Sequence, residues 1–416
     1  MRRNFHQKKW RRKYLLGAWE QRKLGEVVKI NGRIGFRGYT QADIIRKEDG
    51  GILAFSPTNI INNKLDFNVK NTYITKDKYY ESPEIMVKNG DILFVKTGST
   101  LGKSASVSNL NEEATINPQI VILRATSYFI SEFISSYLIS NNILKQVAQT
   151  RIGGAVPTLT ETEIKRFQIS APKGKEQQKI GTLFKQLDDT IALHQRKIEQ
   201  LKLLKQAFLQ KMLANQENVP ELRFADFDEE WEPRKLLDVA NIVGGGTPNT
   251  NNPEFWDGDI DWYSPAEIGE QSYVNNSRKK ISYLGLQKSS AKILPVGTVL
   301  FTSRAGIGNT AILAKEGATN QGFQSIIPHK DKLDSYFIYS RTPELKRYGE
   351  LSGAGSTFIE VSGKQMANMS LLFPNLKEQQ KIGSFFKQID NTISLHKKKL
   401  SNIKKLKKAC LQSMFI

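Results

Sequence analysis

The longest regular pattern of apolar positions occurs twice in the chain. In residues 175–216 apolar side chains return every seven residues in two interleaved rows, and the same rows reappear in residues 375–416. Aligned over 175–214 and 377–416, the two segments are identical at 23 of 40 positions. Apolar residues at the first and fourth positions of successive heptads form the seam of a coiled coil. The pattern therefore predicts two long helices, and the simplest partner for the first is the second.

The residues predicted to form this helix-pairing seam lie on one face of each helix. In the first helix they are Ile180, Phe184, Leu187, Ile191, His194 and Ile198, and in the second Ile382, Phe386, Ile389, Ile393, His396 and Leu400. In an antiparallel pair related by a pseudo-twofold axis the two histidines are near the helix midpoints and are predicted to face each other. A polar residue at one seam position fixes the register of a coiled coil, and a pH switch is the alternative.

Outside the helices, short apolar runs are separated by Gly, Asn and Pro, which is typical of strands and turns. Each of the two regions opens on a Trp-Glu-x-Arg-Lys-Leu motif, at residues 19–24 and 231–236, and closes just before a long helix. A shorter helix is predicted over Phe129–Gln149. The predicted segments are a basic lead-in (1–18), a first domain (19–174), a central helix (175–216), a second domain (217–374) and a distal helix (375–416).

The predicted fold class is therefore α+β. Two α/β domains of mixed short strands and helices are separated by two long antiparallel coiled-coil helices, and the whole has a pseudo-twofold internal repeat. A glycine-rich polar loop follows a predicted strand in each domain, KTGSTLGK at 96–103 and SRAGIGNT at 303–310. The domains match in layout although most of their residues differ. Such a pattern suggests helices that keep one geometry while the domains recognise different things.

The net charge of +20 favours a polyanionic partner. The basic lead-in and the two helical segments together account for +19 of it. Domains that bind nucleic acid must then use locally placed bases, and solvated lysines on the helices are an equally good explanation of the excess. The lead-in itself could be an arm on phosphates, a disordered tail or the product of an upstream start.

The single cysteine, Cys410, lies at a predicted seam position and excludes a disulfide framework or a cysteine zinc site. No apolar run approaches the ~18 residues of a membrane span. The basic N-terminus lacks the apolar stretch of a signal peptide. A cytoplasmic protein without a membrane partner is therefore expected.

The sequence motifs that define several enzyme classes are incomplete in this chain. The stretch GSTLGKS (98–104) resembles a phosphate-binding loop, but it has one residue too few between its glycines and precedes a predicted strand instead of a helix. The stretch NPEF (252–255) resembles an adenine methyltransferase motif but lacks its second proline. The four histidines lack metal-ligand spacing. A metal site and catalytic residues are accordingly not predicted.

Taken together, these stretches resemble the specificity subunit of type I restriction–modification enzymes. The most specific are the repeated KEQQKIG (175–181 and 377–383) and the segment GGGTPNTNNPEFWDGDIDWYSPAEI (244–268), and the loops 97–105 and 304–312 also fit. The resemblance covers nearly everything after residue 18, and residues 1–18 do not match the family.

The resemblance implies a non-catalytic DNA-binding subunit whose two target recognition domains each read one half of a bipartite sequence in double-stranded DNA. The paired helices would set the spacing and bind two modification subunits, the adenine methyltransferases, and up to two restriction subunits could join. No cofactor is expected in this chain, whereas S-adenosylmethionine, ATP and Mg are expected on the partner subunits.

Base edges are read by Arg, Lys, Asn, Gln, Ser or Thr on loops that enter the major groove, and phosphates by lysines and backbone N–H groups. The predicted DNA-binding residues are Lys96, Thr97, Ser99, Lys103 and Arg151 in the first domain and Thr247, Arg304, Asn309 and Gln321 in the second. For each residue a solvated loop position is the plain alternative. The alternative functions are a single-chain methyltransferase or nuclease, and a coiled-coil scaffold that binds only protein.

Overall fold

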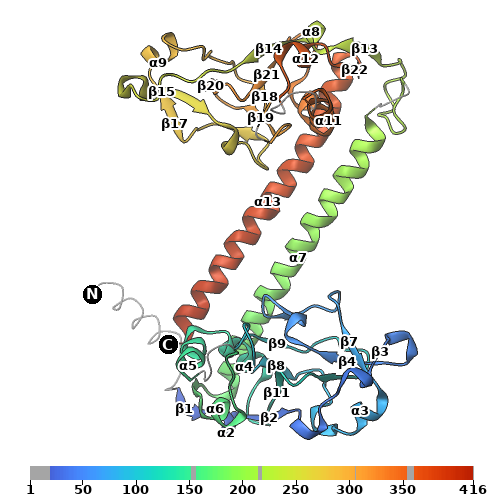
Figure 1. Cartoon of the computed structure of the whole chain (residues 1–416), viewed down its shortest axis with the longest axis vertical. Helices are drawn as coiled ribbons and strands as arrows, with labels where there is room; N and C mark the ends of the chain where they lie inside the picture. Colours follow the sequence, from blue (N-terminus) through green and yellow to red (C-terminus); the bar gives the residue numbers. More distant parts are fainter. Residues whose placement is uncertain (1–18, 151–155, 214–217, 305, 354–359, 416) are drawn as a thin grey trace. The chain divides into compact units, whose positions relative to one another are not determined.

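The computed structural model describes residues 19–150, 156–213, 218–304, 306–353 and 360–415 (Figure 1). The chain forms two compact units, one made of Met1–His194 with Lys399–Ile416 and the other of Gln195–Lys398. Two helices of 39 residues each, α7 (Gly174–Met212) and α13 (Leu376–Met414), contribute to both units. Each unit contains one α/β domain.

The first domain is built on two four-stranded sheets. One has the order β2-β11-β8-β9 with antiparallel neighbours, and the other has the order β10-β4-β7-β3 with a parallel β10–β4 pair. The strands of the two sheets are β2 (Val28–Gly32), β11 (Ile120–Ala125), β8 (Ile92–Val95), β9 (Ser104–Ser106), β10 (Ala114–Ile116), β4 (Ile52–Phe55), β7 (Thr72–Ile74) and β3 (Ile44–Ile45). All four residues of β8 and of β4 are buried. Ile92 and Phe94 of β8 join a core with residues of α4, whereas Leu93 and Val95 join a second core with residues of β4.

Smaller elements complete this domain. They are the antiparallel pair β1 (Glu20–Lys23) and β12 (Gln168–Ala171), the hairpin β5 (Ile60–Ile61) and β6 (Lys64–Leu65), and the helices α2 (Leu24–Val27), α3 (Lys76–Tyr80), α4 (Ser131–Leu138), α5 (Asn141–Thr150) and α6 (Glu161–Arg166).

The prediction of one helix over Phe129–Gln149 was wrong, because α4 and α5 are separate helices. The Ser140 amide closes the last turn of α4 on the Tyr137 carbonyl, and the Ser140 carbonyl accepts from Leu144 as α5 begins. Ser and Asn favour helix starts over helix interiors, and the break lets side chains from both helices, Tyr137 and Val147 among them, reach one core.

The second domain repeats this plan with a five-stranded sheet of order β14-β21-β18-β19-β16 and a three-stranded sheet of order β17-β15-β20. Its elements are β13 (Glu232–Lys235), α8 (Leu236–Val239), β14 (Ala240–Gly244), β15 (Trp256–Tyr263), β16 (Tyr273–Val274), β17 (Lys279–Ile281), α9 (Tyr283–Gln287), β18 (Val299–Phe301), β19 (Thr310–Leu313), β20 (Ala318–Thr319), β21 (Gln324–Pro328), α10 (Ser335–Ser340), α11 (Thr342–Gly353), α12 (Gly363–Ala367) and β22 (Ser370–Phe373). As β1 does with β12, β13 pairs antiparallel with β22.

The two long helices run antiparallel within each unit. In the first unit the rings of Phe184 and Phe415 stack at 5.5 Å, and Lys407 Nζ lies 2.7 Å from Asp188 Oδ1. In the second unit Lys205 Nζ lies 2.7 Å from Asp390 Oδ1. Residue numbers rise along α7 as they fall along α13, and the two ion pairs involve equivalent positions of the repeat. The predicted antiparallel coiled coil with an internal repeat is confirmed in each unit.

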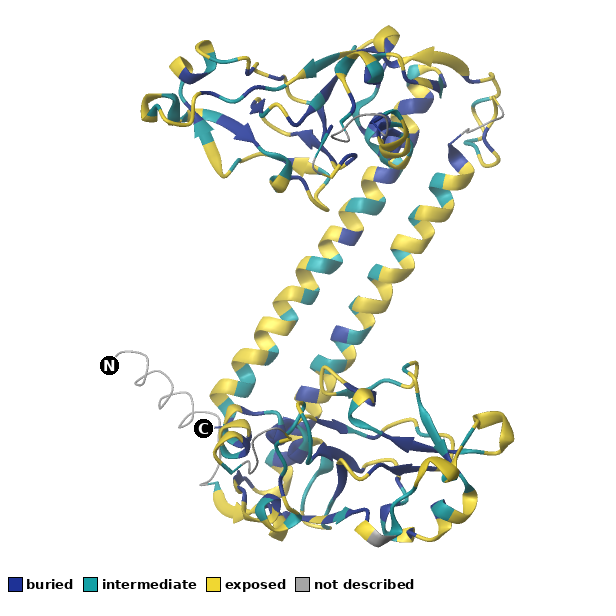
Figure 2. Ribbon diagram, in the orientation of Figure 1, coloured by how far each residue is buried: buried dark blue, intermediate teal, exposed yellow. Residues whose placement is uncertain are grey.

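The predicted seam positions are all buried or half-buried, and exposed residues separate them along both helices (Figure 2). Buried are Ile180, Phe184, Ile191, Ile382, Phe386 and Ile393, and half-buried are Leu187, His194, Ile198, Ile389, His396 and Leu400. The seam residues near the start of each helix also join the core of a domain. His194 and His396 belong to different units, and their contact stays a prediction.

Candidate nucleic-acid interface and its helical support

Three turns converge at one edge of the first domain. They are the 3-10 turn Pro57–Asn59 after β4, the glycine-rich loop 96–103 after β8, and the turn at Asn117 that joins β10 to β11. The backbone amide of Asn117 donates to the backbone carbonyl of Phe55 at 2.8 Å, and the backbone amide of Lys96 donates to the backbone carbonyl of Gln119 at 2.8 Å. These backbone bonds hold the three turns side by side.

The second domain builds the same frame from different residues. Here the turns are Pro265–Glu267, the loop 303–310 and the turn at Asn320. The backbone amide of Asn320 donates to the backbone carbonyl of Tyr263 at 3.0 Å, and the backbone amide of Ser303 donates to the backbone carbonyl of Gly322 at 2.8 Å. A common backbone frame that presents different side chains is the arrangement expected of two readers of different sequences.

The Ser-Pro turn of this frame was not among the predicted site residues. Its signal is present in the sequence as Phe-Ser-Pro-Thr-Asn-Ile at 55–60 and Tyr-Ser-Pro-Ala-Glu-Ile at 263–268. In each copy the Ser amide donates to the side-chain oxygen of the residue three positions on, Asn59 or Glu267. This capping box fixes the turn beside the glycine-rich loop.

The glycine-rich loops owe their glycines to backbone conformation. Gly98 has φ +106° and the corresponding Gly306 has φ +104°, a region that residues with a side chain rarely adopt. The strand β9 follows the first loop, so the resemblance of GSTLGKS to a phosphate-binding loop before a helix does not extend to the fold.

Three of the predicted residues of the first domain, Thr97, Ser99 and Lys103, line one cavity of about 440 Å³ together with Thr58 and Gln119. The Lys103 and Ser99 side chains are exposed. Lys96 is half-buried beside them, with its backbone bonded to Gln119 and Leu159. Arg151 lies outside the described residues. Apolar residues also line the cavity, and its hydroxyl, amide and ammonium groups are of the kinds that contact base edges.

In the second domain the frame brings together Thr247, Gln321 and Arg304. The Thr247 hydroxyl donates to the Gln321 side-chain carbonyl, and the Arg304 guanidinium lies 3.9 Å from the Glu360 carboxylate. A Cβ on Gly245 would lie 2.0 Å from the Asn320 carbonyl oxygen, so the glycine run before Thr247 packs directly on the turn. Asn309 is exposed at the far end of the loop.

The repeated KEQQKIG motif docks each domain on its long helix. In the first unit Gln177 Oε1 accepts from the Ile130 amide at 3.1 Å, just before α4. In the second, Gln379 Oε1 accepts from the Asp334 amide at 3.1 Å, just before α10. Both glutamines are buried, and each also donates to a backbone carbonyl of the segment that leads into its own helix, Pro172 or Pro374.

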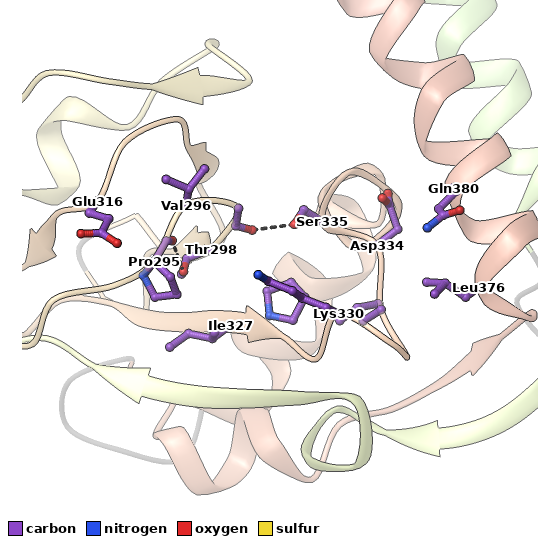
Figure 3. A pocket seen from close by; sticks show the side chains of 13 residues that line it. Pro295, Val296, Thr298, Glu316, Ile327, Lys330, Asp334, Ser335, Leu376 and Gln380 are labelled. Carbon is purple, nitrogen blue, oxygen red and sulfur yellow. Dashed lines mark hydrogen bonds between the residues drawn. The ribbon is translucent and has the colours of Figure 1, made fainter.

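Figure 3 shows the pocket beside this junction, with Asp334 and Ser335 at the start of α10 and Gln380 on α13. Asp334 caps α10 by accepting from the Tyr336 and Phe337 amides at 2.9 and 2.8 Å, and burial raises the pKa of its carboxyl. Ser335 donates to the Gly297 carbonyl at 2.7 Å. A cavity of about 430 Å³ lies between the 295–298 turn, the start of α10 and Gln380 of α13.

The Trp-Glu-x-Arg-Lys-Leu motif at 19–24 adds a second contact to α7, and Arg223, in the segment before the motif at 231–236, adds one to α13. Trp19 Nε1 donates to Glu176 Oε1 at 3.1 Å, and the Trp19 ring packs edge-on against Phe133. In the second unit Arg223 forms two 2.8 Å bonds with the buried Glu378 carboxylate. These bonds raise the pKa of Arg223.

Alanine at Gly383 is expected to lower the free energy of unfolding by about 1–3 kcal/mol. The added Cβ would lie 2.4 Å from Asp334 Oδ1 and 3.0 Å from the Phe337 amide nitrogen, and such overpacking outweighs the ~1 kcal/mol that alanine gains over glycine in a helix. Gly174→Ala, whose Cβ meets nothing within 4 Å, is the matched control. Thermal unfolding of both variants measures the difference, and equal stability would contradict the docking role of Gly383.

The described residues contain no group of three or more His, Cys, Asp or Glu side chains placed to hold a metal ion. Among the described helices, none combines the length and apolar character that a membrane span requires.

Two α/β domains with one loop frame and different side chains, both docked by a repeated motif on long paired helices, define a two-domain recognition protein. Residues 17–203 and 228–405 match the family described as Type I restriction modification DNA specificity domain. The chain belongs to this family, and it is therefore a DNA-recognition subunit and not a catalytic one.

Individual relatives agree with this assignment. The chain is 34% identical over 191 residues to the type I restriction enzyme MjaIX specificity subunit of Methanocaldococcus jannaschii, an alignment that covers 45% of this chain and 44% of the relative. It thus spans about half the length of that relative. It is 23% identical to the HindI specificity subunit of Haemophilus influenzae, in an alignment that covers 94% of this chain and 98% of the relative.

Solved structures share the fold. The type I restriction–modification S subunit from M. genitalium has a TM-score of 0.64 at 13% identity, covering 97% of this chain and 98% of that one. A chain from a study of complex assembly and conformational transition of the type I R-M system has a TM-score of 0.51 at 19% identity, covering 95% and 97%.

Proposed function

We propose that the chain recognises an asymmetric DNA sequence of two separated halves, with one half read by each domain. The observation that carries the proposal is the shared three-turn frame, which presents Thr97, Ser99 and Lys103 in one domain and Thr247, Arg304 and Gln321 in the other. Different polar side chains on one frame would read different base edges in the same docking geometry. The plain alternative of solvated loop residues predicts that their substitution leaves recognition unchanged.

The two long helices, called here the spacer helices, would fix the distance between the halves. Each domain is docked on them by equivalent contacts, so half-site spacing would follow protein geometry, as it does for dimeric DNA-binding proteins. Joining two modest half-sites on one rigid support also raises affinity through effective concentration.

Partner subunits would supply the chemistry. In this proposal two modification subunits carry S-adenosylmethionine and methylate adenine, while up to two restriction subunits use ATP and Mg. The chain itself would hold none of these cofactors. Incubation of the purified chain alone with DNA and labelled methyl donor is expected to give no incorporation, and incorporation would instead support a single-chain methyltransferase.

The deciding experiment is a map of adenine methylation across the genome of a host that expresses the modification subunit with and without this chain. The expected result is a new motif of two short blocks around a fixed gap, present only with the chain. If no motif depends on the chain while the two proteins still form a complex, the chain is a protein scaffold and the proposal fails.

The outer faces of the spacer helices offer a docking surface for the two modification subunits. Leu193 and Leu204 of α7 are 58% and 47% exposed, and the equivalent Leu395 and Leu406 of α13 are 50% and 54% exposed. Each unit therefore presents one exposed leucine from each helix, Leu193 with Leu406 in the first and Leu395 with Leu204 in the second. The same set occurs once in each unit, which suits two copies of one partner.

Glutamate at both Leu193 and Leu406 is expected to remove one modification subunit from the complex, because two charges would replace the apolar contact in one unit. Native mass spectrometry of the copurified complex should change from two copies per chain to one. Glutamate at the neighbouring exposed positions Lys197 and Gln200 is the matched control. Two copies still bound to the double leucine variant would exclude this surface.

A further inference from the structure

Asp188 and Asp390 occupy the same position in the two spacer helices, and each receives a lysine from the other helix. Lys407 Nζ lies 2.7 and 2.8 Å from the two Asp188 carboxylate oxygens, and Lys205 Nζ lies 2.7 Å from both of those of Asp390. The ion pair is therefore a repeated feature of the helix pair. The contacts between each carboxylate and the α/β domain of its own unit differ between the two units.

In the second unit a buried tyrosine of the α/β domain forms a hydrogen bond with Asp390. Tyr336 of α10, only 4% exposed, donates its hydroxyl to Asp390 Oδ2 at 2.8 Å. The same hydroxyl lies 3.1 Å from Ser272 Oγ, in the loop that precedes β16, and the Tyr339 hydroxyl lies 3.3 Å from that oxygen. Asp390 of α13 thus joins α7 to α10, and the Tyr336 hydroxyl extends this network to the 270–273 loop.

Two further contacts hold the 270–273 loop on the spacer helices. Lys397 of α13 pairs with Glu270, and Lys387 Nζ lies 5.3 Å above the Tyr273 ring. The loop is therefore attached to α13 on both sides of Asp390.

Among the described residues of the first domain, a lysine makes the contact with Asp188. Lys64, on the β5–β6 hairpin, donates to the Asp188 backbone carbonyl at 2.8 Å and lies 3.9 Å from its carboxylate. The Lys64 side chain is 41% exposed. A long, partly solvated ammonium holds a fixed geometry less well than a buried phenol bonded to a carboxylate.

Asp390 and the docking motif hold the second domain at two separate points along α13. Asp390 lies seven residues after Gly383, which is about 10 Å along the helix. A domain held at one point on a helix can pivot about that point, whereas two points this far apart fix its orientation.

We propose that Asp390, Tyr336 and Ser272 form an orientation lock that sets the angle of the second domain on the spacer helices and so restricts the gap in the DNA sequence to one length. The lock rests on the function proposed above. Changing the gap by one base pair moves a half-site by about 3.4 Å and turns it by roughly 35° about the DNA axis. A locked domain cannot follow that movement, and an unlocked one can.

Tyr336→Phe tests the lock, because it removes one hydroxyl and keeps the ring. With the modification subunit present, the methylation map of this variant is expected to retain both half-sites and to gain gaps one base pair shorter and longer. We expect methylation at those gaps to rise roughly tenfold, the effect of losing one charge-assisted hydrogen bond. Lys64→Met is the matched control and should add fewer gaps. A single unchanged gap in Tyr336→Phe, or altered half-sites, would overturn the lock.

Hydrogen exchange on the full-length chain alone provides a readout that does not depend on DNA recognition. The amides of residues 270–273 are expected to exchange faster in Tyr336→Phe than in the unaltered chain, and at the unaltered rate in Lys64→Met. Equal exchange in all three chains overturns the lock whatever the methylation map gives. If the unaltered chain and Tyr336→Phe both give a split motif with one and the same gap, the lock is wrong and the proposed function stands. If the unaltered chain gives no motif, the proposed function is wrong.

Discussion

Exchange of residues 231–374 for the same segment of another family member is expected to replace one half of the recognised sequence and to leave the other half unchanged. Both ends of the segment lie at the antiparallel pair of β13 and β22, so the graft enters and leaves the domain at one place. The docking residues Gln379 and Gly383 stay in the recipient chain. The new domain should therefore dock as the old one does.

The effect of this exchange should be close to all-or-none. Specific binding exceeds non-specific binding by about 10³–10⁷, so methylation of the original sequence should fall to background as the new one appears. The methylation map of the chimaera gives both values at once. A chimaera that carries the recipient's own domain, rebuilt through the same joints, controls for damage at the junctions. A change in both halves would mean that the domains are not independent readers.

The long helices and the internal repeat were predictable because their signals are local and periodic. Apolar residues that return every seven positions, and a second copy identical at 23 of 40 positions, leave few alternatives for a helix and its partner. The same holds for the strands that end at the glycine-rich loops, since the apolar runs before Lys96 and Ser303 are short and bounded by turn residues.

The roles of the repeated motif residues could not be predicted, because they depend on contacts between distant segments. Gln177 meets the Ile130 amide 47 residues away, and Gly181 lies against the backbone of Phe133. Periodicity identifies the helix face on which such residues lie and not what packs there. The break between α4 and α5 was missed for the same reason, since the shared core decides it and not helix propensity alone.

The places of the candidate DNA-contact residues in the fold could be predicted in part. Loop composition was enough to select Thr97, Ser99 and Lys103, which the fold brings to one cavity. The Ser-Pro turn beside them was overlooked because Ser56 and Ser264 act through capping of a turn, which depends on the backbone conformation. Which of these side chains touches a base remains a prediction that substitution and a methylation map can test.

Insertion of one heptad after His194 and a second after His396 is expected to lengthen the gap in the DNA sequence, to the length at which the added rise and the turn of roughly 35° per base pair both fit the locked second domain. Seven residues add roughly 10 Å of helix, and each base pair adds about 3.4 Å. A whole heptad keeps the apolar seam in register, whereas a four-residue insertion would unwind it locally. The ion pairs Lys205–Asp390 and Lys407–Asp188 lie on either side of the insertions and should both persist.

Insertion of the heptad into α7 alone is the control that separates helix length from helix pairing. It moves α7 by seven residues against α13, so the stack of Phe184 on Phe415 and the contact of Phe208 with Phe385 cannot both form. Thermal unfolding should show a large loss of stability, and methylation should be lost at every gap. The paired insertion should unfold normally and methylate the lengthened sequence. An unchanged gap in a stable, active paired variant would mean that the spacer helices do not set the distance between the half-sites.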